Sequence, residues 1–278
     1  MKKFLIRTAT GAAFVAVLLG AILYGKTSFG ILFAAVTAMS VLEFCRLING
    51  YKNTTFSKAL AVAGGVYLNF AVFAACHCAC LSTMALFLPY ILIVAYAFVR
   101  QLFDTRSNPL DNYAYFVLSQ VYAALPFALL SFISTAGAEP GTTYSWLMPI
   151  SIFIFIWCND SGAFCVGCTM GRHKMFERVS PKKTWEGFFG GVAVAVAAGI
   201  VMSRFFTIMN IWEWTGMALT VAVSGTLGDL VESSMKREMQ IKDSGNILPG
   251  HGGMLDRFDS TLLAVPCVVI YLSLIGIL

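Results

Sequence analysis

The chain has 278 residues, of which 58% are hydrophobic and only 12% are charged, and its mean hydropathy is +0.78. A water-soluble globule of this length needs more polar residues to cover its surface, so the composition excludes that class and predicts an integral membrane protein. The formal net charge of +5 is modest, and we expect no nucleic-acid partner.

Apolar windows long enough to cross the hydrocarbon core as helices follow one another along the chain. They lie near 8–24, 29–48, 59–76, 81–99, 113–135, 146–168, 187–206, 212–231 and 261–278. We therefore predict an all-α, polytopic membrane protein of about nine transmembrane helices, forming a single integral membrane domain over 1–278. The first window has no obvious signal-peptide cleavage site, so we interpret it as a membrane helix.

The basic residues indicate the orientation of these helices. If the N-terminus is cytoplasmic, only Lys26 and Arg204 of the 19 Lys and Arg residues fall on the opposite side. Basic residues concentrate in cytoplasmic loops of membrane proteins, so this asymmetry supports both the helix count and a cytoplasmic N-terminus. We expect a multi-pass protein of the bacterial inner (plasma) membrane.

Residues that could carry chemistry are concentrated in 157–260, because the loops of the first 150 residues are short and chemically plain. Asn159 and Asp160 come first and interrupt an apolar run. An ionisable group within a membrane helix usually faces a cavity and marks a functional site. A structural hydrogen bond to a neighbouring helix is the alternative.

The segment 180–187 comes next along the chain. Ser180 followed by Pro181 is typical of a helix N-cap and first helical position, so we predict a helix that starts here and enters the membrane. With Lys182 and Lys183, this helix N-terminus would suit a phosphate group. The alternative is a basic anchor for anionic lipid.

Polar residues also gather on one face of the helix predicted around 228–237. Asp229, Glu232, Ser233, Lys236 and Arg237 follow helical spacing and share that face. Carboxylate and hydroxyl oxygens together with cations suit a metal-bound polyphosphate. A solvated helix end with a Glu232–Lys236 pair is the alternative.

The last polar segment precedes the final apolar window. Glycines on both sides of His251 would let the backbone approach a ligand and direct amide groups at an anion, although a plain surface turn would also use them. Asp256 and Asp259 lie three residues apart at the expected start of a helix. They could hold a divalent cation or favour the helix dipole.

The order and spacing of these motifs resemble a known family. The run Ser233-x-Met235-Lys236-Arg237, then Lys242-Asp243-x-Gly245, then Pro249-x-His251-Gly252-Gly253-x-x-Asp256-Arg257-Phe258-Asp259 is similar to the signature of phosphatidate cytidylyltransferases, also called CDP-diacylglycerol synthases. The upstream segments Asn159-Asp160, Gly171-Arg172 and Ser180-Pro181-Lys182-Lys183-Thr184-x-Glu186-Gly187 also resemble that family. The resemblance covers about the C-terminal half; the first half is similar only as a hydrophobic multi-helix region.

This resemblance implies that CTP and phosphatidate react at the cytoplasmic membrane face to give CDP-diacylglycerol and pyrophosphate. It implies Mg²⁺ as cofactor, with a second cation left open, and metal ligands Asp229, Asp256 and Asp259. The catalytic residues implied are Asp229, Lys236, Arg237, Lys242, Asp243, His251, Asp256, Arg257 and Asp259, with no base role assigned to His251. The implied substrate-binding residues are Asp160, Ser180, Lys182, Lys183, Thr184, Glu186, Ser233, Gly252 and Gly253.

Two other classes of function remain as alternatives. One is a CTP-dependent enzyme acting on another lipid phosphate or a polyprenol, such as an archaeal-type CDP-lipid synthase or a lipid kinase-like enzyme. The other is a transporter in which Asp160 and Glu43 are relay groups, but the charged residues cluster on one side and no inverted repeat is present. Otherwise we expect Glu43 to pair with Arg46 or a neighbouring helix near the cytoplasmic surface. A homodimer is left open.

Overall fold

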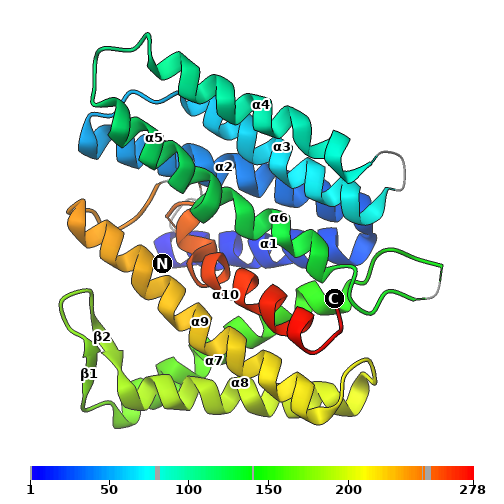
Figure 1. Ribbon diagram of the computed structural model, residues 1–278. Helices are drawn as coiled ribbons and strands as arrows, with labels where there is room; N and C mark the ends of the chain where they lie inside the picture. The colour runs from blue at the N-terminus through cyan, green and yellow to red at the C-terminus, as the bar shows by residue number, and fades with distance from the viewer. Residues whose placement is uncertain (1, 79–81, 140, 246, 248–251) are drawn as a thin grey trace. The chain divides into compact units, whose positions relative to one another are not determined.

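The computed structural model describes residues 2–78, 82–139, 141–245, 247 and 252–278, with only the backbone of 2–7 (Figure 1). Within these residues the chain forms nine continuous helices and one two-stranded hairpin. The helices are α1 (Lys2–Tyr24), α2 (Lys26–Lys52), α3 (Lys58–His77), α4 (Thr83–Gln101), α5 (Pro109–Leu118) continuing through the π-helical η1 (Ser119–Ala124) into α6 (Leu125–Ile133), α7 (Leu147–Met170), α8 (Trp185–Phe205), α9 (Ile211–Glu238) and α10 (Leu255–Leu274). The antiparallel hairpin joins β1 (Lys174–Phe176) to β2 (Ser180–Thr184).

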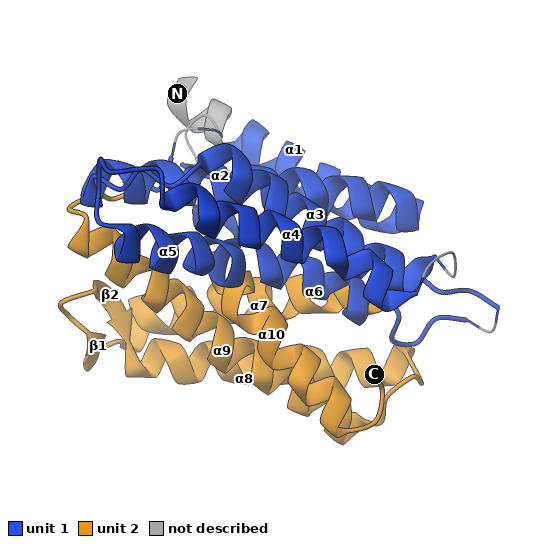
Figure 2. Ribbon diagram, turned by 45° about the horizontal axis from the view of Figure 1, so that its top comes forward, with its two compact units in different colours: residues 1–146, 243–258 blue, residues 147–242, 259–278 orange. Residues whose placement is uncertain are grey.

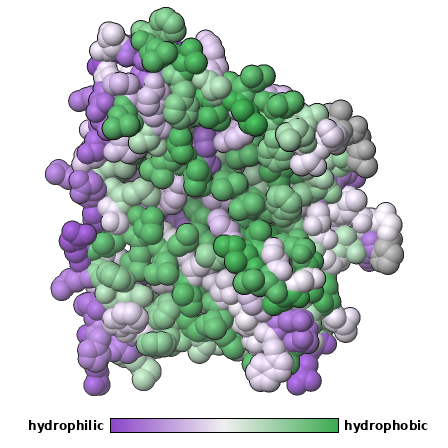
Figure 3. Space-filling view, in the orientation of Figure 1, coloured by the Kyte–Doolittle hydropathy of each residue, from purple (hydrophilic) through white to green (hydrophobic). Residues whose placement is uncertain are grey.

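Seven of the helices in the described residues are long and apolar enough to cross a membrane, so the chain is a polytopic membrane protein. They are α2, α3, α4, the continuous helix Pro109–Ile133, α7, α8 and α10. In α4 only 6% of the apolar window is buried, so its apolar side chains are available to lipid. Figure 3 shows hydrophobic residues, in green, over most of the visible face.

The chain divides into two compact units (Figure 2). Unit 1 comprises 1–146 and 243–258, and its core contains a chain of aromatic contacts. Phe33 lies 4.8 Å from Phe29 and 6.4 Å from Phe127, and Phe127 makes an edge contact with Phe258 at 5.3 Å, measured between ring centroids. Aromatic pairs of this kind add to the burial of apolar area. The start of α10 is thereby packed into the core of unit 1.

Unit 2 comprises 147–242 and 259–278, and glycines bring its helices α7 and α8 close together. A Cβ atom at Gly187 would lie 2.9 Å from the carbonyl oxygen of Ala163, and one at Gly191 would lie 2.6 Å from that of Asn159. Small residues permit this close backbone approach, which is the usual basis of helix packing in membranes. The contact holds Asn159 beside the beginning of α8.

Each of the nine predicted windows overlaps a separate helix of the structure. Two helices are not among the seven that meet the length and hydropathy criteria for a span. In α1, side chains are described only from Thr8 on, and the apolar stretch Thr8–Tyr24 is shorter than the length criterion. The other helix is α9, which ends in the polar residues that the sequence places on one face.

The predicted helix start at Ser180 is wrong. Ser180–Thr184 forms strand β2, paired with Lys174–Phe176, and α8 begins only at Trp185. Thr184 is the N-cap, because its Oγ1 accepts a hydrogen bond from the amide of Gly187 at 3.2 Å. Pro181 is tolerated because this sheet has only edge strands, where a missing amide donor costs little.

The glycine contact between α7 and α8 gives a first prediction. Gly191→Leu should lower the free energy of unfolding by about 1–3 kcal/mol, because the new side chain meets the backbone of Asn159. Gly20→Leu on α1 is the matched control, since no atom lies within 4 Å of a Cβ there. Thermal unfolding in detergent measures both variants, and equal stabilities would contradict the packing argument.

Candidate active site

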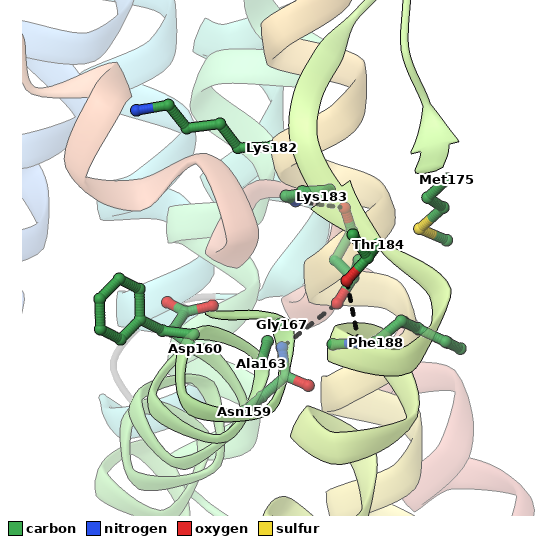
Figure 4. Close-up of a pocket in the computed structure, with 12 residues that line it drawn as sticks. Asn159, Asp160, Ala163, Gly167, Met175, Lys182, Lys183, Thr184 and Phe188 are labelled. Carbon is green, nitrogen blue, oxygen red and sulfur yellow. Dashed lines mark hydrogen bonds between the residues drawn. The ribbon is translucent and has the colours of Figure 1, made fainter. Parts of the chain in front are cut away.

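A largely apolar pocket of about 220 Å³ lies within unit 2, between the second half of α7, the hairpin of β1 and β2, the first turn of α8 and the middle of α9. Figure 4 shows Asn159 and Asp160 on α7 and, above them in the view, Lys182, Lys183 and Thr184 on β2. The pocket is lined by Asn159, Asp160, Ala163, Phe164, Gly167, Met175, Lys182, Lys183, Thr184, Gly187, Phe188 and Thr226. It combines apolar walls with a few charged and polar groups, as ligand sites commonly do.

The hairpin that carries the two lysines is fastened at its base by Glu186. The Glu186 carboxylate accepts hydrogen bonds from the backbone amides of Arg172 and His173, at 3.1 and 3.2 Å, and it contacts Nδ1 of His173 at 2.5 Å. The amide of Trp185 also donates to the carbonyl oxygen of His173 at 2.9 Å. The first turn of α8 therefore fixes where β1 begins and where β2 ends.

Lys183 forms a salt bridge to α9. Its Nζ lies 2.7 Å from Oδ2 of Asp229 and 3.4 Å from the carbonyl oxygen of Thr226. The other carboxylate oxygen of Asp229 accepts a hydrogen bond from Ser233 at 3.1 Å, one helical turn later. Both ends of the Lys183–Asp229 bridge are partly exposed, 26% and 31% by side chain, and Lys183 also lines the pocket.

Asn159 is joined to the same part of α9. Its Nδ2 donates to Oγ1 of Thr226 at 3.2 Å, and among the described residues its buried Oδ1 has no hydrogen-bond partner. Both alternatives that the sequence left open for Asn159 and Asp160 are therefore present. Asn159 makes a structural hydrogen bond between helices, and Asp160 lines the cavity.

Carboxylates from three helices interact around Asp229. The negative charge of Asp229 repels the carboxylates of Asp160 on α7 and Asp259 on α10, and the charge of Asp160 also repels Asp259. Lys183 offsets the repulsion at Asp160, and Lys236 offsets it at Asp259. Gly228 permits this arrangement, since a Cβ there would lie 2.7 Å from the carbonyl oxygen of Asp259.

The polar face predicted for α9 is present, and two of its members hold their neighbours. Lys236 pairs with the buried carboxylate of Glu232 at 3.4 Å, so the intrahelical pair that the sequence allowed exists. Arg237 donates from Nε to the carbonyl oxygen of Val179 at 3.2 Å and from Nη1 to that of Ile241 at 3.4 Å. Arg237 therefore ties the hairpin turn to the end of α9, and Lys242 beyond it is exposed.

The remaining predicted residues belong to unit 1. Oδ2 of Asp256 accepts hydrogen bonds from the amides of Ser244, at 2.8 Å, and Gly253, at 2.7 Å, so this side chain organises its own loop. Gly252 has a φ of +84°, a conformation that favours glycine. Asp243 and Arg257 are exposed, and His251 lies outside the described residues.

Sequence reasoning missed one residue that shapes these regions and the partners of another. Thr226 carries no motif signal, but it binds both Asn159 and Lys183. Glu43 was expected to pair with Arg46 or with a neighbouring helix, and it accepts hydrogen bonds from Ser244 and from Leu255, the first residue of α10, more than 200 residues away in the sequence. Only the three-dimensional fold brings these partners together.

The carboxylates beside the pocket are compatible with Mg²⁺, which prefers carboxylate oxygens and retains waters or substrate phosphates as further ligands. Asp229 and Asp259 offer such oxygens and repel each other. Among the described residues no group of three His, Cys, Asp or Glu side chains is placed to hold a metal by itself. One or two carboxylates completed by phosphate oxygens is the arrangement that these residues fit.

The fold and pocket define a polytopic membrane protein with basic and acidic groups suited to a phosphorylated ligand. Comparison with known proteins narrows this class. The model of the cytidylyltransferase family matches residues 5–275, and the chain belongs to this family.

Relatives with a named function match a shorter segment. The phosphatidate cytidylyltransferase of Staphylococcus epidermidis is 47% identical over 121 residues, which is 43% of this chain and 46% of that protein. The proteins of the same name from Staphylococcus aureus and Staphylococcus haemolyticus are 46% identical over 121 residues, with the same coverage. The matched segment thus spans less than half the length of these relatives.

The contacts of Glu186 give a second prediction. Glu186→Ala should speed tryptic cleavage after Arg172, Lys174 and Arg178 by about tenfold, because it removes the hydrogen bonds that close the base of the hairpin. Glu177→Ala is the matched control, an exposed carboxylate in the turn of the same hairpin. Gel analysis of timed digests measures the rates, and equal rates for the two variants would refute the structural role of Glu186.

Proposed function

We propose that this protein is a phosphatidate cytidylyltransferase, which transfers CMP from CTP to phosphatidate and releases pyrophosphate. The observation that carries the proposal is the salt bridge of Lys183, which lines a pocket together with Asp160, to Asp229, whose charge also acts on Asp259. Cations and carboxylates side by side suit a polyphosphate together with its metal ion. Membership of the cytidylyltransferase family and the names of the staphylococcal relatives support the same reaction.

The chemistry requires little proton transfer. A lipid phosphate monoester is largely ionised near neutral pH, so one of its oxygens can attack the α-phosphorus of CTP without a strong base. A new P–O bond forms to the α-phosphorus, the bond from that phosphorus to the bridging oxygen of the β-phosphate breaks, and the electron pair leaves with pyrophosphate. Two anions must approach each other, so catalysis rests on alignment and charge neutralisation.

The described residues can be assigned to these tasks. Lys183 and Lys182 on β2 would hold oxygens of the lipid phosphate or of the triphosphate, beside the N-terminus of α8, whose amides favour anions. Lys236 would neutralise charge on the polyphosphate. Asp229 and Asp259 would hold Mg²⁺, which supplies positive charge at the phosphate oxygens when bound. Asp160 forms part of the pocket wall.

Other residues implied by the resemblance keep their proposed roles. Arg237, Lys242 and Arg257 would neutralise the departing pyrophosphate, and Asp256 would be a further metal ligand. The substrate sites would be shaped by Ser180, Thr184, Glu186, Ser233, Gly252 and Gly253. Asp243 and His251 would position the signature loop, by which we mean residues 243–256. For Glu186, Thr184, Arg237 and Asp256, the contacts described above favour a role in holding backbone segments in place.

The proposal includes a topology. Nine membrane helices with a cytoplasmic N-terminus would place β1, β2 and the 232–260 segment on the cytoplasmic side, where CTP is available. The bacterial plasma membrane is the expected location. A second cation and a homodimer are left open.

The test is to incubate purified protein in detergent with phosphatidate, Mg²⁺ and each nucleoside triphosphate in turn. We expect pyrophosphate and a CDP-lipid only with CTP or dCTP. A phosphorylated lipid with CDP as second product would instead support a lipid kinase-like enzyme, and an archaeal-type lipid preferred over phosphatidate would support a CDP-lipid synthase of another class. Folded protein with no turnover on any of these substrates would favour a transporter.

The metal assignment gives a separate prediction. Asp229→Asn should lower kcat by about 100-fold and shift the magnesium dependence to higher concentration, because a neutral amide is a poorer ligand and leaves Lys183 without its ion pair. Asp111→Asn, an exposed carboxylate at the start of α5, is the control. Initial rates across a magnesium titration, ending in chelator, measure the effect. A normal rate with unchanged magnesium dependence would overturn the assignment of Asp229.

A further inference from the structure

A buried carboxylate in unit 1 holds the signature loop from a distant part of the chain. Glu43 lies on α2 and is 3% exposed. Its Oε2 accepts a hydrogen bond from Oγ of Ser244 at 3.3 Å and one from the backbone amide of Leu255 at 3.0 Å. These two donors flank the loop, because Ser244 follows the Lys242-Asp243 motif and Leu255 precedes Asp256. Burying a carboxylate is costly unless such donors compensate it.

Two glycines of the signature loop leave the space that the Glu43 carboxylate occupies. A Cβ atom at Gly253 would lie 2.5 Å from Oε2 and 2.6 Å from Oε1 of Glu43, and a Cβ at Gly245 would overlap Oε1. The backbone of the loop therefore lies directly against Glu43 at both positions. Any side chain at Gly245 or Gly253 would have to displace the carboxylate.

A second carboxylate, within the loop itself, also accepts hydrogen bonds from the loop backbone. Asp256 accepts the amides of Ser244 and Gly253 with a single oxygen. Ser244 thus donates a hydrogen bond from its hydroxyl to Glu43 and one from its backbone amide to Asp256. The amide of Leu255, two residues after Gly253, also donates to Glu43. The two described ends of the loop, 243–245 and 252–256, are held together by these two carboxylates.

We propose that Glu43 is a positioning residue for the reaction, fixing the loop that presents Asp243, Asp256 and Arg257. The inference rests on the proposed function, since those residues are assigned through it. Glu43 does not touch substrate in this account; it acts through the backbone that it binds. Its carboxylate is suited to this task because one oxygen serves donors from both sides of the loop.

The experiment compares Glu43→Gln with Glu139→Gln, an exposed carboxylate in the 134–146 loop. Two readouts are used on detergent-purified protein. Hydrogen exchange by mass spectrometry, on peptides that contain Ser244 or Gly253–Leu255, reports the loop directly and needs no activity. Steady-state kinetics with CTP and phosphatidate report kcat and KM separately.

For Glu43→Gln we expect exchange of the Leu255 peptide to rise about tenfold or more, because an amide is a weaker acceptor than a carboxylate. The kcat should fall about tenfold or more, while the KM for phosphatidate changes less than threefold. Glu139→Gln should match the wild type in both readouts. Ser244→Ala should give a smaller loss in kcat, and combining it with Glu43→Gln should add little, because both remove the same contact.

Several results would overturn the proposal. Unchanged exchange at Leu255 in Glu43→Gln would show that the carboxylate does not hold the loop. Faster exchange with a normal kcat would show that holding the loop does not serve the reaction. If Glu43→Gln fails to fold, Ser244→Ala decides by the same readouts. If the wild type makes no CDP-lipid, the proposed function fails by that assay, while the exchange data still decide whether Glu43 holds the loop.

Discussion

Charged groups beside a membrane are stable only when other charges or hydrogen-bond donors compensate them, and the Lys183–Asp229 bridge meets this requirement in unit 2. It joins a hairpin to α9, and Arg237 strengthens the same connection through the carbonyl oxygen of Val179. The hairpin has only two short strands and would be marginal alone. Its place in the fold therefore depends on these contacts with α9 and on Glu186 at its base.

This dependence has a chemical consequence for ligand binding. Lys183 neutralises Asp229 across the bridge, so neither of these two groups is left with an uncompensated charge. A phosphate oxygen would compete with Asp229 for Lys183, and a metal ion would compete with Lys183 for Asp229. An anion bound together with its cation satisfies both groups at once, whereas either one alone leaves a charge uncompensated. Under the proposed function, the bridge would favour a metal–nucleotide complex over its separate components.

The helices could be predicted from the sequence because their signal is local. Apolar windows of about 20 residues give the helix bodies, and residues at helical spacing give the polar face of α9. The hairpin could not be predicted in this way. Ser180-Pro181 is typical of a helix start, and a three-residue strand such as β1 is too short to show an alternating pattern. Thr184, four residues later, provides the N-cap instead.

The contacts between distant segments were beyond local patterns. Glu43 and Leu255 are 212 residues apart, and Asn159 and Thr226 are 67 apart. Spacing along a helix says which residues share a face, but it cannot say which other segment that face will meet. The sequence therefore singled out residues that line the pocket, such as Asp160, Lys182 and Lys183, whereas it could not give their partners. Asp256 illustrates this limit, since its backbone hydrogen bonds were not expected and its metal role stays a prediction.

Glycine has a different structural role in the helices than in the loop motifs. In the sequence, glycines near 245–253 attract attention as ligand-binding turns, while Gly228 is an unremarked helical residue. In the structure Gly228 lets the backbone of α10 approach α9 at Asp259, next to Asp229. Four carboxylates, Asp160, Asp229, Glu232 and Asp259, are thereby linked with two lysines, Lys183 and Lys236, by ion pairs or longer-range electrostatic interactions. When all are ionised, negative charges exceed positive ones by two, and one divalent cation would balance that excess.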